Sequence, residues 1–269
     1  MNRMKRSLAL VLAVILTVGA LAVPALAADW PQFLGEPSAP GISGGAAATS
    51  GNNLKLRWEK NTGSTWSDVP GTPIVVGNYV YYYSSQYLRK LDLATGREVA
   101  KAQVYGEPVN QFFINIAYGE GKIFVPCQTD NLNDNVEISG CFLRVFDANT
   151  LKQLYVTETL SSGQMQSPVM YHNGYFVTGV YGRNGVYAGF DASDEDPSIS
   201  DEIKKMKWTV KTDSQYGFSF NGAAFVGNYC YFGCENKLYV VEYKTGKVKT
   251  FDIGAEYSIR SSISYSSET

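Results

Sequence analysis

Aromatic, amide and charged side chains recur at five places in the chain, each shortly before an apolar run. A concave ligand site uses such a mixture, because rings stack against flat groups while amides and charges orient the ligand. The candidate binding residues are Trp66, Asp68, Phe112, Phe113, Gln166, Tyr216, Phe218 and Arg260. Large rings also fill the gaps between packed sheets, and packing is their more frequent role. The sequence leaves both roles open for these residues.

The sequence offers few residues that could act as a catalytic base. His172 is the only histidine, so a Ser-His-Asp or Cys-His arrangement would have to use it, and a His-rich zinc site cannot form. It stands in a Tyr-His-Asn-Gly sequence typical of a turn, where we expect a solvated side chain. We therefore predict no catalytic residues, and an enzyme is the less favoured class of protein.

An acidic run, residues 191–202, invites comparison with a calcium-binding loop. Positions 1, 3, 5 and 12 of the loop template are matched by Asp191, Ser193, Glu195 and Glu202. The sixth position is Asp196, where the template needs glycine for its sharp turn. The sequence thus predicts a solvated insertion between two strands, with nearby lysines balancing its charge. We predict no metal and no cofactor.

The candidate residues need a scaffold, and an internal repeat supplies one. Each repeat contains an apolar strand, a glycine turn, two further strands, an acidic turn and a fourth strand. The glycine turns are Gly77-Asn78, Glu120-Gly121, Asn173-Gly174 and Gly227-Asn228, and the acidic turns open on Asp92, Asp147, Asp191 and Glu242. The acidic positions lie 55, 44 and 51 residues apart, which is the period of a four-stranded propeller blade.

The repeat predicts an all-β fold, a β-propeller of four-stranded antiparallel blades. We expect blades at about residues 72–104, 115–159, 167–211 and 222–253, after a lone strand at 54–59 and before the start of a fifth blade at 261–265. In a propeller, the links from each outer strand to the next inner strand share one face around the central opening. The eight candidate binding residues fall in such links, so the fold would gather them at one rim.

Five stretches of the chain resemble the pyrroloquinoline-quinone-like β-propeller repeat family. They are Asp29–Phe33, Leu54–Trp58, Leu91–Arg97, Phe146–Thr150 and Val241–Lys247. The resemblance covers nearly all of the chain after its first 27 residues. It implies a ring of about seven or eight blades, with an N-terminal strand that completes the last blade. The four blades and the start of a fifth fall short of that number, so we expect an incomplete ring from a truncated chain.

Residues 1–27 are typical of a signal peptide. Arg3, Lys5 and Arg6 precede an apolar run, and Ala25-Leu26-Ala27 is a small-x-small cleavage site. We therefore expect a secreted or cell-surface protein, with an extended segment at 28–53 and a partial propeller domain at 54–269. The processed chain would carry 20 Lys and Arg against 25 Asp and Glu, a net charge of −5. That balance disfavours nucleic acid and anionic membranes as partners, and no later run is long enough to insert into a bilayer.

Four cysteines in an exported chain raise the question of disulfide bonds. Cys127 and Cys141 end and begin two successive strands, so a hairpin could place them opposite each other and allow a disulfide in an oxidising compartment. Cys230 and Cys234 lie on one strand, where their separation of about 13 Å is too long to bridge. We expect these two to be buried thiols.

One function is favoured over its alternatives. The signal peptide, the repeat and the missing nucleophile–base set favour an exported, non-enzymatic binding module or scaffold for a protein or glycan ligand. The resemblance implies a second candidate, a quinoprotein-like oxidoreductase that uses pyrroloquinoline quinone (PQQ) and calcium. Such enzymes use a catalytic aspartate and often a disulfide between adjacent cysteines, but this chain has no Cys-Cys dipeptide and none of its residues matches their cofactor ligands. A third candidate is a scaffold in envelope assembly, like the propeller lipoproteins of outer-membrane biogenesis, although no cysteine stands at the cleavage point.

Overall fold

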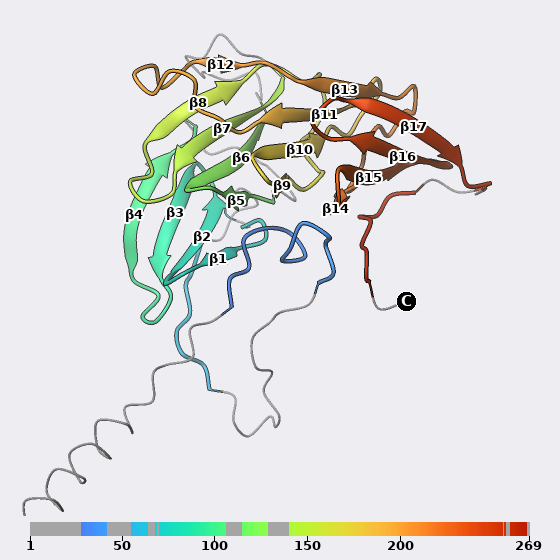
Figure 1. Cartoon of the computed structure of the whole chain (residues 1–269). Helices are drawn as coiled ribbons and strands as arrows, with labels where there is room; N and C mark the ends of the chain where they lie inside the picture. The colour runs from blue at the N-terminus through green and yellow to red at the C-terminus, as the bar shows by residue number, and fades with distance from the viewer. Residues whose placement is uncertain are drawn as a thin grey trace, which may run out of the picture.

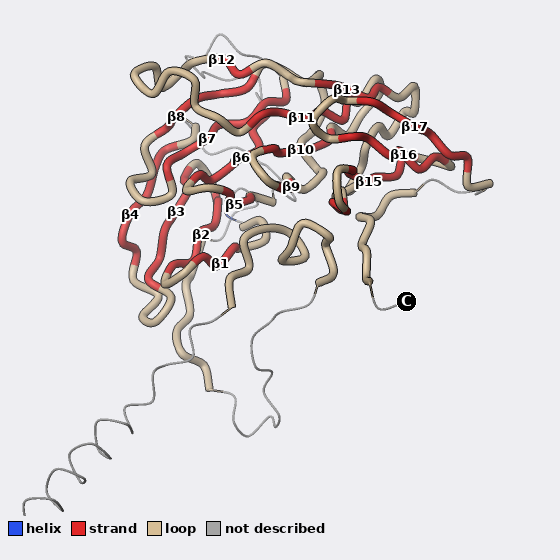
Figure 2. Tube along the Cα trace, viewed as in Figure 1, coloured by secondary structure: helices blue, strands red, loops and turns tan. Residues whose placement is uncertain are grey.

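The computed structural model describes residues 28–41, 55–63, 68, 70–105, 115–128, 140–254, 256 and 259–267. Over this part of the chain the secondary structure consists of strands and turns, with no α-helix (Figure 2). The strands form four sheets that follow one another in chain order and fan out around a common side (Figure 1). This arrangement is the β-propeller expected from the repeat, and the described residues form an incomplete ring.

The first two repeats form blades one and two. Blade one contains β1 (Ile74–Val76), β2 (Tyr79–Ser84), β3 (Tyr87–Asp92) and β4 (Glu98–Gln103). Blade two contains β5 (Ala117–Gly119), β6 (Lys122–Gln128), β7 (Cys141–Asp147) and β8 (Gln153–Thr157). Within each blade the strands pair in chain order, so that the first strand is innermost and the fourth is outermost.

The next two repeats form blades three and four. Blade three contains β9 (Met170–His172), β10 (Tyr175–Gly179), β11 (Val186–Asp191) and β13 (Trp208–Lys211). Blade four contains β14 (Ala224–Val226), β15 (Tyr229–Cys234), β16 (Lys237–Glu242) and β17 (Lys247–Asp252). The acidic insertion lies between the third and fourth strands of blade three, as the sequence predicts.

The insertion of blade three covers the outer edge of blade two. Its short strand β12 (Ile203–Lys204) pairs in parallel with β8. Glu158, which follows β8, accepts the main-chain N–H of Met206 at 2.6 Å and pairs with Lys205 at 3.1 Å. An uncovered outer strand presents unpaired main-chain groups that can recruit other chains. The insertion therefore protects one edge and ties two blades together, a contact that the sequence did not indicate.

The turns explain why the repeat is regular. The first residue of each glycine turn has a positive φ, between +45° and +58°, as tight hairpins require. In the acidic turn of blade one, Asp92 Oδ1 accepts the main-chain N–H and the hydroxyl of Thr95 at 2.8 and 2.6 Å. Asp147 and Thr150 repeat the pattern in blade two. The bonds from Thr95 hold the pKa of Asp92 below its usual value.

Alternate residues of the middle strands pack against the blades on either side. In β6, Phe124 belongs to the apolar cluster shared with blade three, whereas Ile123 and Val125 belong to the cluster shared with blade one. Between blades three and four, the rings of Tyr187 and Phe232 stack with their centroids 3.8 Å apart. Blades two and three, which have a neighbouring blade on each side, therefore bury both faces of their sheets. This burial explains why their strands are rich in Val, Tyr and Phe.

The N-terminal segment, residues 29–38, crosses the inner strands, and we name it the strap. Five main-chain N–H groups donate to it, from the equivalent position of five successive repeats: Val75, Tyr118, Tyr171, Phe225 and Tyr265. Their acceptors are the main-chain oxygens of Trp30, Pro31, Pro37 and Ser38 and the side-chain oxygen of Gln32, at 2.7 to 3.0 Å. Nine residues span at most about 30 Å even when fully extended. The inner strands must therefore converge on one centre, beside the N-terminal segment in Figure 1.

The expected strand at 261–265 is present only as an extended segment. Besides the bond of Tyr265 to the strap, the N–H of Ile263 donates to the carbonyl of Gly222 at 3.0 Å. No strand is assigned there, because a strand requires a continuous ladder with a neighbour. The segment occupies the innermost position of a fifth repeat.

The lone strand expected at 54–59 is not formed over the described residues 55–59. Trp58 nevertheless anchors this stretch, because its Nε1–H donates to the carbonyl of Leu93 at 2.9 Å and its ring covers Gly96. Gly96 has a φ of +69°, and a Cβ there would strike the indole ring. Both constraints favour glycine at this position of the acidic turn.

Trp208 makes the same two kinds of contact with the acidic turn of blade four. Its Nε1–H donates to the carbonyl of Tyr243 at 2.8 Å, and its ring covers Gly246, with a φ of +77°. Trp208 begins the outer strand of blade three and touches the acidic turn of blade four. By this equivalence, Trp58 marks the place of an outer strand next to blade one. Both tryptophans are packing residues.

The pairing register of β6 and β7 in blade two does not place Cys127 opposite Cys141. Cys127 pairs with Phe142, and Gln128 pairs with Cys141. The offset of one residue places the two thiols on opposite faces of the sheet, one toward blade one and the other toward blade three. The register therefore does not support the possible disulfide, and all four cysteines are buried without forming a disulfide. The expectation of buried thiols at 230 and 234 is confirmed.

We expect the thiols to react only when the protein unfolds. Burial raises the pKa of the Cys141 thiol to about 12, so its reactive thiolate is scarce at pH 8. Titration with a thiol reagent, without reductant, should count almost no thiols in the native protein and four after denaturation. A count of about two after denaturation would instead reveal a disulfide and contradict the register.

Candidate functional site

The links from outer to inner strands form one face of the ring, which we name the link face. Its described parts include residues 68, 70–73, 104–105, 115–116, 158–169, 212–223 and 259–262. Three of the eight candidates, Trp66, Phe112 and Phe113, lie outside the described residues. The structure places the other five: Asp68, Gln166, Tyr216, Phe218 and Arg260.

The turn between β10 and β11 holds two links in place. Tyr181, at the start of this turn, forms antiparallel bridges with Gln164 on one side and Gly217 on the other. Two main-chain hydrogen bonds of 2.9 and 3.0 Å join Tyr181 to Gln164. The links before β9 and before β14 therefore lie on either side of one turn, which positions the side chains that they carry.

Side chains from three links form a connected group, which we name the rim cluster: Gln166, Tyr216, Ser219 and Arg260. The guanidinium of Arg260 lies over the ring of Tyr216, 4.7 Å from its centroid, and Nη2 lies 3.4 Å from Ser219 Oγ. The Ser219 hydroxyl donates to Gln166 Oε1 at 3.5 Å. Three predicted residues thus come together. Ser219 was missed, although its place in a predicted link was the available signal.

The rim cluster presents a cation on an aromatic platform. Arg260 is exposed, the ring of Tyr216 is 38% exposed, and no salt bridge among the described residues involves this arginine. A planar guanidinium held over a ring offers several donors in fixed directions, which suit a carboxylate or sugar hydroxyl groups. The cluster can therefore bind an acidic or hydroxyl-rich group, and it contains no nucleophile–base pair.

Phe218 lies in the core and not at the rim. Its side chain is fully buried and packs edge-to-face on Tyr187 and Phe232, with centroids 5.2 and 5.7 Å apart. The hydroxyl of Ser167 donates to its carbonyl oxygen. For this ring the packing role is the observed one. The fifth described candidate, Asp68, is half-buried with its carboxyl group against Gly63.

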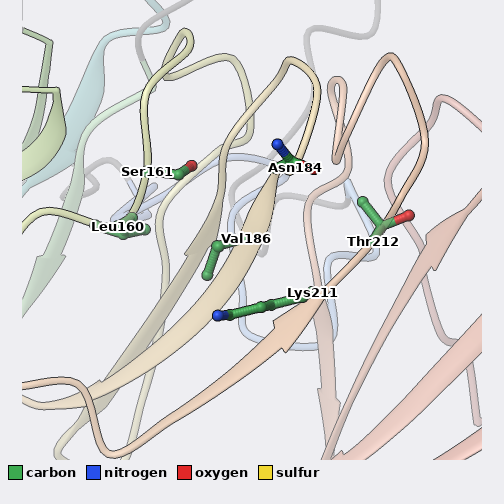
Figure 3. A pocket seen from close by; sticks show the side chains of 6 residues that line it. All are labelled: Leu160, Ser161, Asn184, Val186, Lys211 and Thr212. Carbon is green, nitrogen blue, oxygen red and sulfur yellow. The ribbon is translucent and has the colours of Figure 1, made fainter.

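A depression between blades two and three opens beside the same links (Figure 3). Its volume is about 360 Å³, and its walls are Leu160, Ser161, Asn184, Val186, Lys211 and Thr212. These residues come from the link after β8, the β10–β11 turn, β11 and the end of β13. Sequence reasoning missed them, because no motif connects positions that only the packing of two blades brings together.

The acidic insertion is paired with lysines. Lys204 Nζ lies 2.6 Å from a Glu195 oxygen and 3.0 Å from Ser193 Oγ, and Asp191 lies 4.0 Å from Lys207. Within the described residues, no three His, Cys, Asp or Glu side chains are placed to hold a metal ion.

His172 is half-buried and packs against two rings, so it is less solvated than expected. Its ring stacks on Phe225 at a centroid distance of 5.1 Å and meets Tyr243 edge-on at 5.5 Å. Burial lowers the pKa of His172, which therefore stays neutral at neutral pH. It contributes to the contact between blades three and four.

Solved structures share this fold at low sequence identity. ADHIIG, a quinohemoprotein alcohol dehydrogenase from Pseudomonas putida HK5, is similar with a TM-score of 0.59 and 17% identity, over 83% of this chain and 40% of that one. The computationally designed Ika8 protein has a TM-score of 0.50 and 12% identity, over 73% and 52%. BamB from Moraxella catarrhalis has a TM-score of 0.44 and 13% identity, over 67% and 48%. This chain thus spans about half or less of each of these proteins.

The likeness to ADHIIG and Ika8 supports the fold alone and leaves the activity open. Scans of protein-family models and of curated proteins found no match to the sequence. One fold hosts many functions, so a likeness at this identity carries architecture alone. None of the described residues belongs to a helix long and apolar enough to cross a bilayer.

Two substitutions in one link should separate core from rim. Phe218→Ala removes a buried ring and should lower the free energy of unfolding by about 3–5 kcal/mol. Tyr216→Ala shortens an exposed ring and should lower it by less than about 1 kcal/mol. Urea unfolding followed by tryptophan fluorescence measures both values. Equal losses would contradict the assignment of the two rings to different environments.

Proposed function

We propose that this chain is an exported, non-enzymatic β-propeller that binds a protein or glycan ligand at its link face. The rim cluster carries this proposal, since Arg260 lies exposed over Tyr216 and is joined through Ser219 to Gln166. Export is supported by the sequence of residues 1–27. The propeller supplies the rigid frame that a binding site requires.

A ligand across the rim cluster would contact several blades at once. Gln166 belongs to the link before β9, Tyr216 and Ser219 to the link before β14, and Arg260 to the last described link. The Gln166 amide also donates to Gln164 Oε1 at 2.7 Å, which extends the polar surface. The ring can take a C–H face of a sugar or an apolar side chain, while the guanidinium and amides take its polar groups.

The position of the strap favours binding of the ligand at the link face. The strap bonds to the middle of each inner strand and so occupies the centre of the ring. It begins at the opposite face, because Asp29 Oδ1 accepts the N–H of Gly77 in the first glycine turn at 2.7 Å. The side chains of the rim cluster, which come from three links, lie on the link face instead.

The quinoprotein-like alternative finds less support. The quinone with its calcium ion needs a set of oxygen ligands at one place. Among the described residues, no three acidic, cysteine or histidine side chains form such a set. The likeness to ADHIIG supports the fold alone.

Screening on glycan and peptide arrays tests the proposal. The exported chain should give reproducible hits, and Arg260→Gln and Tyr216→Ala should each weaken them about tenfold, because each removes part of the cation–ring platform. Arg97→Gln is the matched control, since it removes an exposed arginine from the acidic turn of blade one. It should leave the hits unchanged.

Two results would overturn this function. One is the absence of any hit for the unsubstituted chain on both arrays. The other is a set of hits that both rim variants retain at full strength, which would place the ligand elsewhere.

A further inference from the structure

We infer that the depression between blades two and three is a separate binding site for a small carboxylate ligand that also carries hydroxyl groups, a sugar acid. This inference does not depend on the rim cluster. It rests on the unused polar groups of the depression, on its charge and on its size.

Three polar side chains at the depression, those of Ser161, Asn184 and Lys211, lack a partner among the described residues. The Thr212 hydroxyl is already used, since it accepts the N–H of Ser214 at 3.2 Å. Ser161 Oγ is buried and makes no hydrogen bond. The ammonium of Lys211 and the amide of Asn184 form no hydrogen bond or ion pair with a described residue. In a folded protein, buried polar atoms normally find a partner, and an orphaned hydroxyl at a pocket wall points to water or a ligand. An amide and a hydroxyl can both donate and accept, which suits a ligand with hydroxyl groups.

The charge of the depression is positive. Lys211 is its one ionisable lining residue, and none of the lining residues is acidic. Arg183, in the same turn as Asn184, is also exposed, while Asp213 follows Thr212 outside the lining. A cation that faces uncharged donors favours a single negative group on the ligand. In a chain with more acidic than basic residues, this local excess selects against cationic ligands.

The size and shape fit one sugar-sized molecule. A volume of about 360 Å³ lies at the small end of the range for ligand sites. Leu160 and Val186 are nearly buried and provide an apolar wall, against which the C–H groups of a ring can pack. In Figure 3 Lys211 extends below Val186, while Ser161 and Asn184 lie above it, so polar groups flank the apolar wall on two sides.

A pair of matched sugars tests the role of the charge. D-glucuronate and D-glucose differ by one carboxylate, and each is titrated into the exported chain by saturation-transfer NMR and calorimetry. Glucuronate should bind saturably and about tenfold more tightly than glucose, as expected for one charge-assisted hydrogen bond. Equal affinities for the two sugars, or no saturable binding of glucuronate, would overturn the inference.

Lysine variants then locate the site. Lys211→Gln should reduce glucuronate binding to the level of glucose, whereas Lys249→Gln, an equal charge change on the exposed strand β17, should not affect it. Arg260→Gln should also leave it intact, which separates this site from the rim cluster. Both lysines are exposed, so neither variant should alter folding. Full retention of glucuronate binding by Lys211→Gln would contradict the assignment.

Discussion

Main-chain hydrogen bonding at the centre of the ring is the constraint on which the rest of the structure depends. The innermost strand of a blade has a neighbour on one edge only, and each buried N–H without a partner costs about 1–3 kcal/mol. The strap meets this need at the same position of five repeats, from Val75 to Tyr265. It thereby fixes the distance of each blade from the centre. Because the links lead into these fixed inner strands, side chains from successive repeats, such as Gln166, Ser219 and Arg260, come into contact.

The turns were the part of this architecture most open to prediction from sequence. Glycine-containing turns need a positive φ, and acidic turns need a side-chain acceptor. Residues that meet these needs, such as Gly96 and Asp92, therefore recur at regular intervals in the sequence. The strap left no comparable signal, because most of its acceptors are main-chain oxygens that any residue provides. Gln32 is the exception, since its buried side chain bonds the N–H of Tyr171.

The finer features of the site depended on offsets of one or two residues, which a sequence pattern does not reveal. Phe218 and Tyr216 lie in one link, yet one ring is buried and the other is exposed. A hairpin could have placed Cys127 and Cys141 opposite each other, but a register shifted by one residue put them on opposite faces of blade two. The depression near Lys211 arises only from the packing of two blades. The spacing of the repeats therefore predicted Gln166, Tyr216 and Arg260 as candidates for the link face. Their contacts with one another could be seen only in the structure.

The central claim is that the strap holds the inner strands of successive blades at one centre, and native-state amide hydrogen exchange tests it most directly. The account predicts slow exchange at the amides of Val75, Tyr118, Tyr171, Phe225 and Tyr265, because each donates to the strap. Exchange of Tyr118, Tyr171 and Phe225 at the rate of an unstructured peptide would show that these amides face solvent. The inner strands would then not share a centre, and the account would be contradicted.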